Sequence, residues 1–176
     1  RDNVKFTWYV GGFGSGKTFV GSHAALRLAL SAPNGRGLIA RQTLVDLKAT
    51  TMKTFWEVLD RRLIKKWNKT ENLLTLINGH EIYLWGLDDI EKLKSLELGW
   101  FWIDEVNEVD EMTFNILKGR LRHTAQPKRC GFLTSNSEGK NWTYQQFVRG
   151  KGLRSVADHE KFLTIKAPST ENYHLP

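Results

Sequence analysis

The chain has 176 residues, with 26 Lys and Arg against 19 Asp and Glu and a formal net charge of +7. A domain of this length buries about 70% of the surface that its unfolded chain exposes, so it needs neither a disulfide framework nor a structural metal to fold. The single cysteine excludes an intrachain disulfide and a four-cysteine zinc site, and the longest apolar runs fall far short of the ~20 residues of a membrane span.

The first half of the chain predicts two strand–helix units. Residues 4–10 are rich in β-branched and aromatic side chains and predict a strand, and apolar residues at helical spacing predict a helix over 17–30. A short strand over 37–41 and a long helix over 44–66 follow. This alternation favours an α/β fold with a mostly parallel sheet flanked by helices.

The second half adds a hairpin and three more strands. Strands over 73–77 and 81–85 flank Asn78-Gly79, a pair that adopts positive φ at both turn positions and therefore predicts an inserted β-hairpin. The later segments predict, in chain order, a short helix over 88–96, a strand over 100–104, a helix over 111–122, a strand over 131–135, a helix over 142–149 and a strand over 162–165. Residues 1–176 are thus expected to form one domain.

Residues 11–18 read GGFGSGKT and match the phosphate-binding loop, with a predicted strand before them and a predicted helix after them. Glycines allow backbone N–H groups to converge on a triphosphate at a helix N-terminus. Lys17 is expected to reach the β- and γ-phosphates and Thr18 to ligate Mg²⁺. The residues expected to bind ATP are Gly12, Phe13, Gly14, Ser15, Gly16, Lys17 and Thr18. A glycine turn without a ligand would leave the Lys-Thr pair unexplained.

Residues 100–105 read WFWIDE, an apolar segment that ends in two carboxylates. Because ligands bind at the carboxyl ends of strands in open α/β sheets, we expect Asp104 to meet the phosphate loop and to hold Mg²⁺ through its water. Glu105 is then the general base that orients the attacking water, a role worth ~10²–10⁴ in rate. Without the phosphate loop, an ordinary acidic strand end would be the better interpretation.

The pattern also separates classes of nucleotide hydrolases. Residues 68–71 read NKTE and end in the wrong residue for guanine recognition by a small GTPase. The Asp-Glu pair instead indicates the additional-strand, catalytic-glutamate ATPases of the RecA-like type. A third strand ends in Thr134-Ser135-Asn136, where the Asn136 amide is placed to sense the γ-phosphate; an Asn-containing turn explains this local sequence equally well.

Together these segments resemble the ATPase domain of a tailed-bacteriophage terminase large subunit, the DNA-packaging motor. The matching pieces are GGFGSGKT (11–18), KLKSLELGWFWIDE (92–105), TSN (134–136), NWTYQQF (141–147) and STENYHLP (169–176). The resemblance implies Walker A roles for Lys17 and Thr18. It also implies Walker B and catalytic roles for Asp104 and Glu105, and a coupling role for the motif that ends at Asn136.

The resemblance further implies Mg²⁺-ATP hydrolysis that drives double-stranded DNA into a viral procapsid. The implied partners are the portal protein, the terminase small subunit and identical subunits in a ring, in the host cytoplasm at the portal and without a membrane. The family's nuclease domain has no counterpart after Pro176, so residues 1–176 are expected to be the ATPase domain alone and not to cut DNA.

Two features depart from the family pattern. Many of its members have arginine where this loop has Phe13, so a positive charge on the phosphates must come from elsewhere. The segment before the Walker B strand, where some relatives carry an arginine that acts on the neighbouring subunit, offers Lys92 and Lys94. Lys94 is the expected catalytic residue in trans, although a lysine cannot donate bidentately. The alternates are Arg41, Arg120 and Arg122, each of which is also explained as a surface cation.

Other features leave alternatives open. Five cations are expected to form a stripe along the end of the long helix, either tracking DNA phosphates or simply solvated: Arg61, Arg62, Lys65, Lys66 and Lys69. The seven tryptophans are expected in the core, and the histidines show no ligand spacing. Two other functions compete with packaging: a DNA helicase or recombinase-like ATPase, and a nucleotide-dependent interaction switch with little turnover, against which Glu105 argues.

Overall fold

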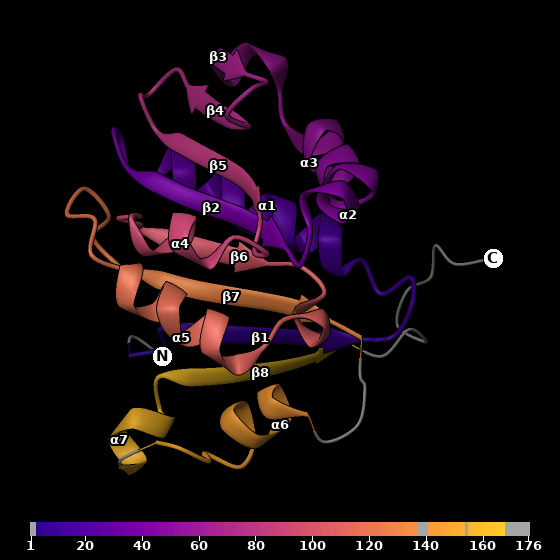
Figure 1. Cartoon of the computed structure of the whole chain (residues 1–176), viewed down its shortest axis with the longest axis vertical. Coiled ribbons are helices and arrows are strands. Elements are labelled where there is room, and N and C mark those ends of the chain that lie inside the picture. The colour runs from indigo at the N-terminus through magenta and orange to yellow at the C-terminus, as the bar shows by residue number, and fades with distance from the viewer. Residues whose placement is uncertain (1–2, 137–140, 154, 168–176) are drawn as a thin grey trace.

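The computed structural model describes residues 3–136, 141–153 and 155–167 and shows one mixed sheet with helices on both faces (Figure 1). The described part of the chain forms eight strands in the order β3-β4-β5-β2-β6-β7-β1-β8. Their bounds are Phe6–Gly11 (β1), Arg36–Arg41 (β2), Ile64–Asn68 (β3), Leu73–Leu76 (β4), Glu81–Gly86 (β5), Trp100–Ile103 (β6), Cys130–Ser135 (β7) and Phe162–Ala167 (β8). The pairs β3–β4 and β4–β5 are antiparallel and the others are parallel. The expected α/β class with an inserted hairpin is confirmed.

Helices cover both faces of the sheet. The α-helices are α1 (Lys17–Leu30), α2 (Leu44–Ala49), α3 (Thr51–Val58), α4 (Ile90–Lys94), α5 (Glu111–Arg120), α6 (Trp142–Phe147) and α7 (Val156–His159). Figure 1 shows α4 and α5 on the near face of the sheet and α1 behind it. Among the described residues, no helix is long and apolar enough to cross a membrane.

The central strand β6 serves two hydrophobic cores because its side chains alternate between the faces. Trp100 and Trp102 lie in the core beneath α1 and α3, whereas Phe101 and Ile103 lie in the core beneath α5. All four are fully buried. A Cβ at Gly21 of α1 would collide with the Trp102 ring, so the glycine lets the helix pack closely on the indole. Trp100 and Trp102 occupy the core as expected, and Trp8 and Trp85 are also buried. The remaining three tryptophans are only partly buried against the cores: Trp56, Trp67 and Trp142.

The predicted helix over 44–66 is two shorter helices, α2 and α3, and the prediction is wrong after Val58. The helix breaks at Thr50 (φ −129°, ψ −77°), and α3 ends at Val58, after which Leu59 is extended. A short 3₁₀ turn, η1 (Arg61–Leu63), leads into β3, which pairs antiparallel with β4. The apolar spacing continues as a strand because β4 supplies hydrogen-bond partners that the local sequence does not reveal. The cations of 61–69 therefore do not form a helical stripe.

The hairpin turn also differs from its prediction. Gly79 has positive φ (80°), but Asn78 does not. The Asn78 side chain instead donates to the carbonyl of Ala29 at the end of α1, at 3.0 Å. This contact holds Asn78 outside the two-residue turn geometry that Asn-Gly otherwise favours. Most other predicted elements are present with ends shifted by a few residues, and α7 was not predicted.

Candidate nucleotide site

The phosphate-loop sequence joins β1 to α1 through a turn that only glycines adopt easily. Gly14 and Gly16 have φ of 72° and 74°, in the left-handed region. Gly16 is also the N-cap of α1, so it offers no side chain to the first N–H groups of the helix. A Cβ at Gly11 would collide with the carbonyl of Ala167. The loop therefore places the N-terminus of α1, where an anion is favoured, directly after the glycine turn.

Lys17 is 7% exposed, and its ammonium is held by oxygen atoms on several sides. Its Nζ donates to the carbonyls of Gly12 (2.8 Å) and Gly11 (3.2 Å) and to the side-chain oxygen of Asn136 (2.9 Å). The Ser15 hydroxyl lies further away, at 3.5 Å. An ammonium has three hydrogens, so the three nearer acceptors already match its capacity. A bound phosphate oxygen would have to replace one of them.

Asp104 follows β6 directly and meets α1 at the carboxyl edge of the sheet. It is 2% exposed, and its Oδ2 accepts from the Thr18 hydroxyl at 3.2 Å. Two further hydroxyls donate to the same carboxylate, from Thr51 and Thr134, each at 2.7 Å. The structure thus brings the end of the phosphate loop and the first acid together. Hydroxyl and carboxylate oxygens are ligands that suit Mg²⁺.

Glu105 has φ 50° and ψ 54°, a left-handed conformation that is uncommon for a residue with a side chain. Its carboxylate accepts from the Asn136 amide at 3.5 Å. Burial raises the pKa of the Glu105 carboxyl above its usual value and the charge of Asp104 adds to this shift, whereas Lys17 and Arg41 oppose it. A raised pKa makes this carboxylate a better proton acceptor.

These side chains line one cleft of about 520 Å³. Its walls are Phe13, Gly14, Gly16, Lys17, Thr18, Phe19, Arg41, Thr50, Thr54, Asp104, Glu105 and Asn136. Of the expected loop residues, Gly12 and Ser15 are not part of this lining, although the Gly12 carbonyl accepts from Lys17. A larger hollow of about 640 Å³ lies between α1 and β7, β1 and β8, but its lining is mostly apolar and contains neither Lys17 nor Asp104. The smaller cleft is therefore the candidate site.

Arg41 is the one alternate cation in the lining of this cleft among the described residues. Its guanidinium donates twice to Glu108 (2.8 and 3.1 Å) and once to the Thr50 hydroxyl (2.7 Å). Its side chain is 14% exposed. A cation of the same chain therefore lies beside Asp104 and Glu105.

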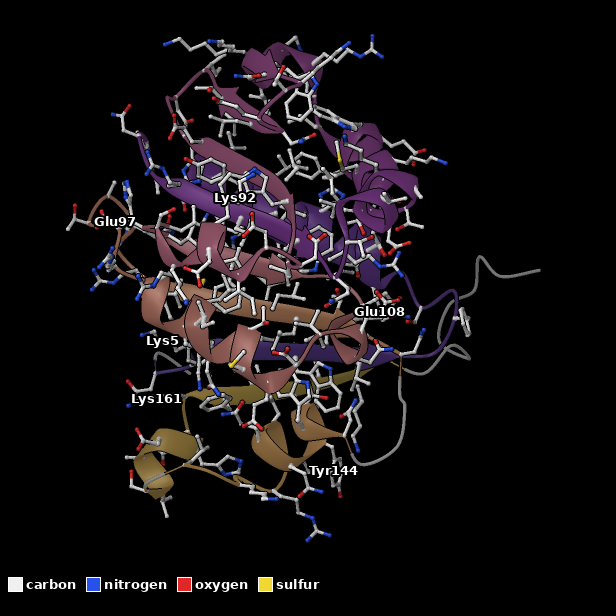
Figure 2. All side chains as sticks on the ribbon, viewed as in Figure 1. Lys5, Lys92, Glu97, Glu108, Tyr144 and Lys161 are labelled. Carbon is white, nitrogen blue, oxygen red and sulfur yellow. The ribbon has the colours of Figure 1, made fainter. Side chains whose placement is uncertain are left out.

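The other candidate cations lie away from the cleft. Lys94 is on α4, half-exposed, and pairs with Glu91 at 2.6 Å. Arg120 donates to the Lys94 carbonyl, and Arg122 pairs with Glu97. In Figure 2, Glu97 lies at one end of the strands, and Glu108, the partner of Arg41, lies at the other end. A catalytic role for Lys94 thus requires a second subunit.

Sequence reasoning missed two threonines that line this cleft and a third that contacts it only through Asp104. Thr50 and Thr54 line it, and Thr51 bonds Asp104. A run of threonines inside a predicted helix gives no local signal of a site, because their position depends on how α3 packs beside β6. Among the described residues, no group of three His, Cys, Asp or Glu side chains is arranged to hold a metal. A cation here would take ligands from Thr18, phosphates and water, with Asp104 holding one of the waters.

A family model described as the phage terminase large subunit matches residues 3–176. The chain belongs to this family. It is 34% identical over 190 residues to the PBSX phage terminase large subunit of Bacillus subtilis strain 168, an alignment that covers 97% of this chain and 43% of that protein. The terminase chain thus spans less than half the length of this curated relative.

Solved structures agree on the fold of this terminase chain. The large terminase of a thermophilic bacteriophage superposes with a TM-score of 0.83 at 17% identity, covering 99% of this chain and 43% of that one. The ATPase domain of the Thermus phage P74-26 large terminase gives a TM-score of 0.69 at 18% identity and covers 94% and 76%. The resemblance to a terminase ATPase domain is confirmed, although its last matching segment, residues 169–176, lies outside the described residues.

Proposed function

We propose that this terminase chain hydrolyses Mg²⁺-ATP and that hydrolysis powers the translocation of double-stranded viral DNA into a procapsid. The observation that carries the proposal is the convergence of Lys17, Thr18 and the pair Asp104-Glu105 on one cleft. The large terminase of the thermophilic bacteriophage, which shares this fold, has been solved with ADP and with ATP-gamma-S. These complexes support an adenine nucleotide as the ligand of this cleft.

Residues of this chain are proposed to bind the phosphates, ligate Mg²⁺ and activate the attacking water. Lys17 and the loop amides bind the phosphates, and the hydroxyl of Thr18 and the carboxylate of Asp104 fit the oxygen donors that Mg²⁺ requires. Bound Mg²⁺ would neutralise charge on the β- and γ-phosphates. Glu105 orients a water for in-line attack on the γ-phosphorus and accepts its proton as the bond to the β-phosphate oxygen breaks.

Asn136 is proposed to couple the two halves of this site. Its oxygen accepts from Lys17, and its nitrogen donates to Glu105. A change in the phosphates held by Lys17 is thereby passed to the proposed base and to the end of β7. This bridge favours the coupling role over a simple turn residue, because a turn asparagine bonds its own backbone.

The proposed partners are double-stranded DNA, the portal protein of the procapsid, the terminase small subunit and further copies of this chain in a ring, at the portal in the host cytoplasm. Within the ring, Lys94 of one subunit would act on the nucleotide of its neighbour. Its half-exposed position on α4, away from its own cleft, is compatible with this role.

The test is Mg²⁺-dependent ATP turnover by this protein, alone and with portal-bearing procapsids and linear duplex DNA. Packaging predicts a rise in turnover when procapsid and DNA are both present, with DNA becoming protected from nuclease. A helicase or recombinase-like ATPase would respond to DNA but not to the portal. Negligible turnover under every condition would contradict hydrolysis and favour a nucleotide-dependent switch.

A further inference from the structure

Thr51 is a buried threonine that belongs to none of the sequence motifs and yet contacts the proposed metal-binding acid. It is the first residue of α3 and is fully buried. Its hydroxyl lies 2.7 Å from Oδ2 of Asp104, a residue 2% exposed. A hydroxyl buried against a carboxylate oxygen at this distance is a strong, charge-assisted donor.

The hydrogen of this hydroxyl is directed at the acid. Threonines within helices commonly donate to the carbonyl four residues earlier, as Thr50 does to Asp46 at 2.9 Å. The Thr51 oxygen also lies 3.5 Å from the Thr50 hydroxyl, but the Asp104 oxygen is much nearer, at 2.7 Å. Thr51 therefore bonds Asp104 rather than satisfying its own helix.

The Asp104 carboxylate is held at both oxygens. Oδ1 accepts from the Thr134 hydroxyl of β7 (2.7 Å), whose own oxygen accepts from the Trp102 indole (2.8 Å). Oδ2 accepts from Thr51 of α3. Rotation of the carboxylate about its last bond would break both short hydrogen bonds, so α3 and β7 together set its orientation.

The contact of Thr18 with the same oxygen is longer, at 3.2 Å. Thr51 thus fixes Oδ2 while the Thr18 oxygen keeps lone pairs free for a cation. The preceding residue, Thr50, contacts the cation of the cleft, since its hydroxyl accepts a hydrogen bond from Arg41. The junction between α2 and α3 is therefore tied to the acid and to the cation that flank the cleft.

We propose that Thr51 is a positioning residue for Mg²⁺ binding, acting by holding the Asp104 carboxylate in the orientation that the cation and its water require. The proposal rests on the proposed function, because it assumes that Asp104 serves Mg²⁺-nucleotide. Partners of metal-binding groups typically contribute 10–100-fold to metal affinity. The expected consequence is a change in the Mg²⁺ dependence of nucleotide binding, separate from turnover.

The experiment follows binding of a fluorescent ADP analogue during Mg²⁺ titration, with a parallel measurement in EDTA. Thr51→Val, which replaces the hydroxyl by a methyl group, should raise the Mg²⁺ concentration for half-maximal effect about ten-fold. Affinity in EDTA should stay within about two-fold, because Thr51 does not line the cleft. Thr51→Ser should keep the wild-type Mg²⁺ dependence, since serine retains the hydroxyl.

Two further variants separate positioning from packing. Thr51→Ala and Thr51→Ser both lack the γ-methyl group and differ only in the hydroxyl, so their comparison gives the same test if Thr51→Val does not fold. Thr143→Val removes another fully buried hydroxyl, which donates to Asn141 at the N-cap of α6, and should change the melting temperature without changing the Mg²⁺ dependence.

A Thr51→Val protein with wild-type Mg²⁺ dependence, or Ser and Ala variants equally impaired, would overturn the positioning role while leaving the proposed function intact. The same holds if Thr143→Val shifts the Mg²⁺ dependence as strongly. A wild-type protein that binds no nucleotide with or without Mg²⁺ would overturn both proposals. Absent turnover alone would contradict hydrolysis but not the role of Thr51, because binding is the measurement.

Discussion

Polar side chains at the carboxyl edge of β1, β6 and β7 are buried or half-buried and bonded to one another, whereas the lysines of the edge strand β3 are exposed. Lys17 and Asp104 are 7% and 2% exposed and share hydrogen bonds with neighbouring segments. Lys65 and Lys66 of β3 are exposed. The hydrogen-bond partners of a buried side chain fix its position, so its position indicates a specific chemical role. Exposed cations are compatible with several roles.

The β3 edge itself offers a structural role for its lysines. Ile64 pairs with Leu76 and Lys66 with Thr75, so Lys65 is the extra residue of a β-bulge. Lysines and bulges on an outermost strand discourage pairing with strands of other molecules. Contact with DNA phosphates remains a prediction for these residues, beside this protective role.

The largest expected effect is at the buried edge. Glu105→Gln keeps the shape of the side chain but removes the proton acceptor, so turnover should fall ~10²–10⁴-fold while nucleotide binding is retained. Steady-state phosphate release and binding of fluorescent ADP measure the two quantities. The matched control is Glu57→Gln on the exposed side of α3, with unchanged turnover expected. Hydrolysis near the wild-type rate in Glu105→Gln would remove this residue from the mechanism.

The variant Lys94→Ala tests whether this exposed cation acts on the nucleotide of a neighbouring subunit in the assembled ring. If it stabilises the transition state in trans, Lys94→Ala should lower turnover of the assembled ring by ~10²-fold. Mixing Lys94→Ala with Glu105→Gln subunits should recover part of the activity, because an intact cleft then meets an intact lysine. No recovery in rings verified to be mixed would count against Lys94 and would direct attention to Arg41, which lies in the cleft of its own chain.

The variant Asn136→Ala tests the hydrogen bonds that join Lys17 to Glu105 at the carboxyl edge of the sheet. Asn136→Ala removes the bridge between Lys17 and Glu105 and should lower turnover about ten-fold, since a hydrogen bond to a charged group is worth ~1.5 kcal/mol or more. ADP affinity should change less, and kcat measured beside the dissociation constant separates the effects. Unchanged turnover would return Asn136 to the role of a turn residue.

The smallest effect is expected at β3. Reversing charge in the double variant Lys65→Glu, Lys66→Glu should reduce DNA-stimulated turnover a few-fold and lower the salt-dependence slope of DNA binding by about 2, while basal hydrolysis is unchanged. The matched control reverses Lys128 and Arg129, an exposed adjacent pair before β7. An unchanged DNA response would leave edge protection as the role of the β3 lysines.

The proposed role of the β3 lysines in preventing strand addition can be measured separately as self-association. Replacing the same two lysines by Thr and Val removes the charges from the outermost strand and should increase concentration-dependent self-association, as seen by light scattering. A protein that stays monodisperse to the same concentration as the parent would show that the bulge alone blocks strand addition.

The phosphate loop, the acidic end of β6 and the α/β alternation could be predicted from the sequence, because each is a local pattern: glycines that permit positive φ, carboxylates after an apolar run, and periodic burial. The burial of Trp100 and Trp102 could be predicted for the same reason. That the chain leaves the helix after Val58 and forms β3 from Ile64 could be learned only from the fold, since it depends on hydrogen bonds with β4. The same is true of the contacts of Thr51 with Asp104 and of Arg41 with Glu108. Those contacts join segments far apart in the chain, and a side-chain hydrogen bond exists only once packing has brought its donor and acceptor within about 3 Å.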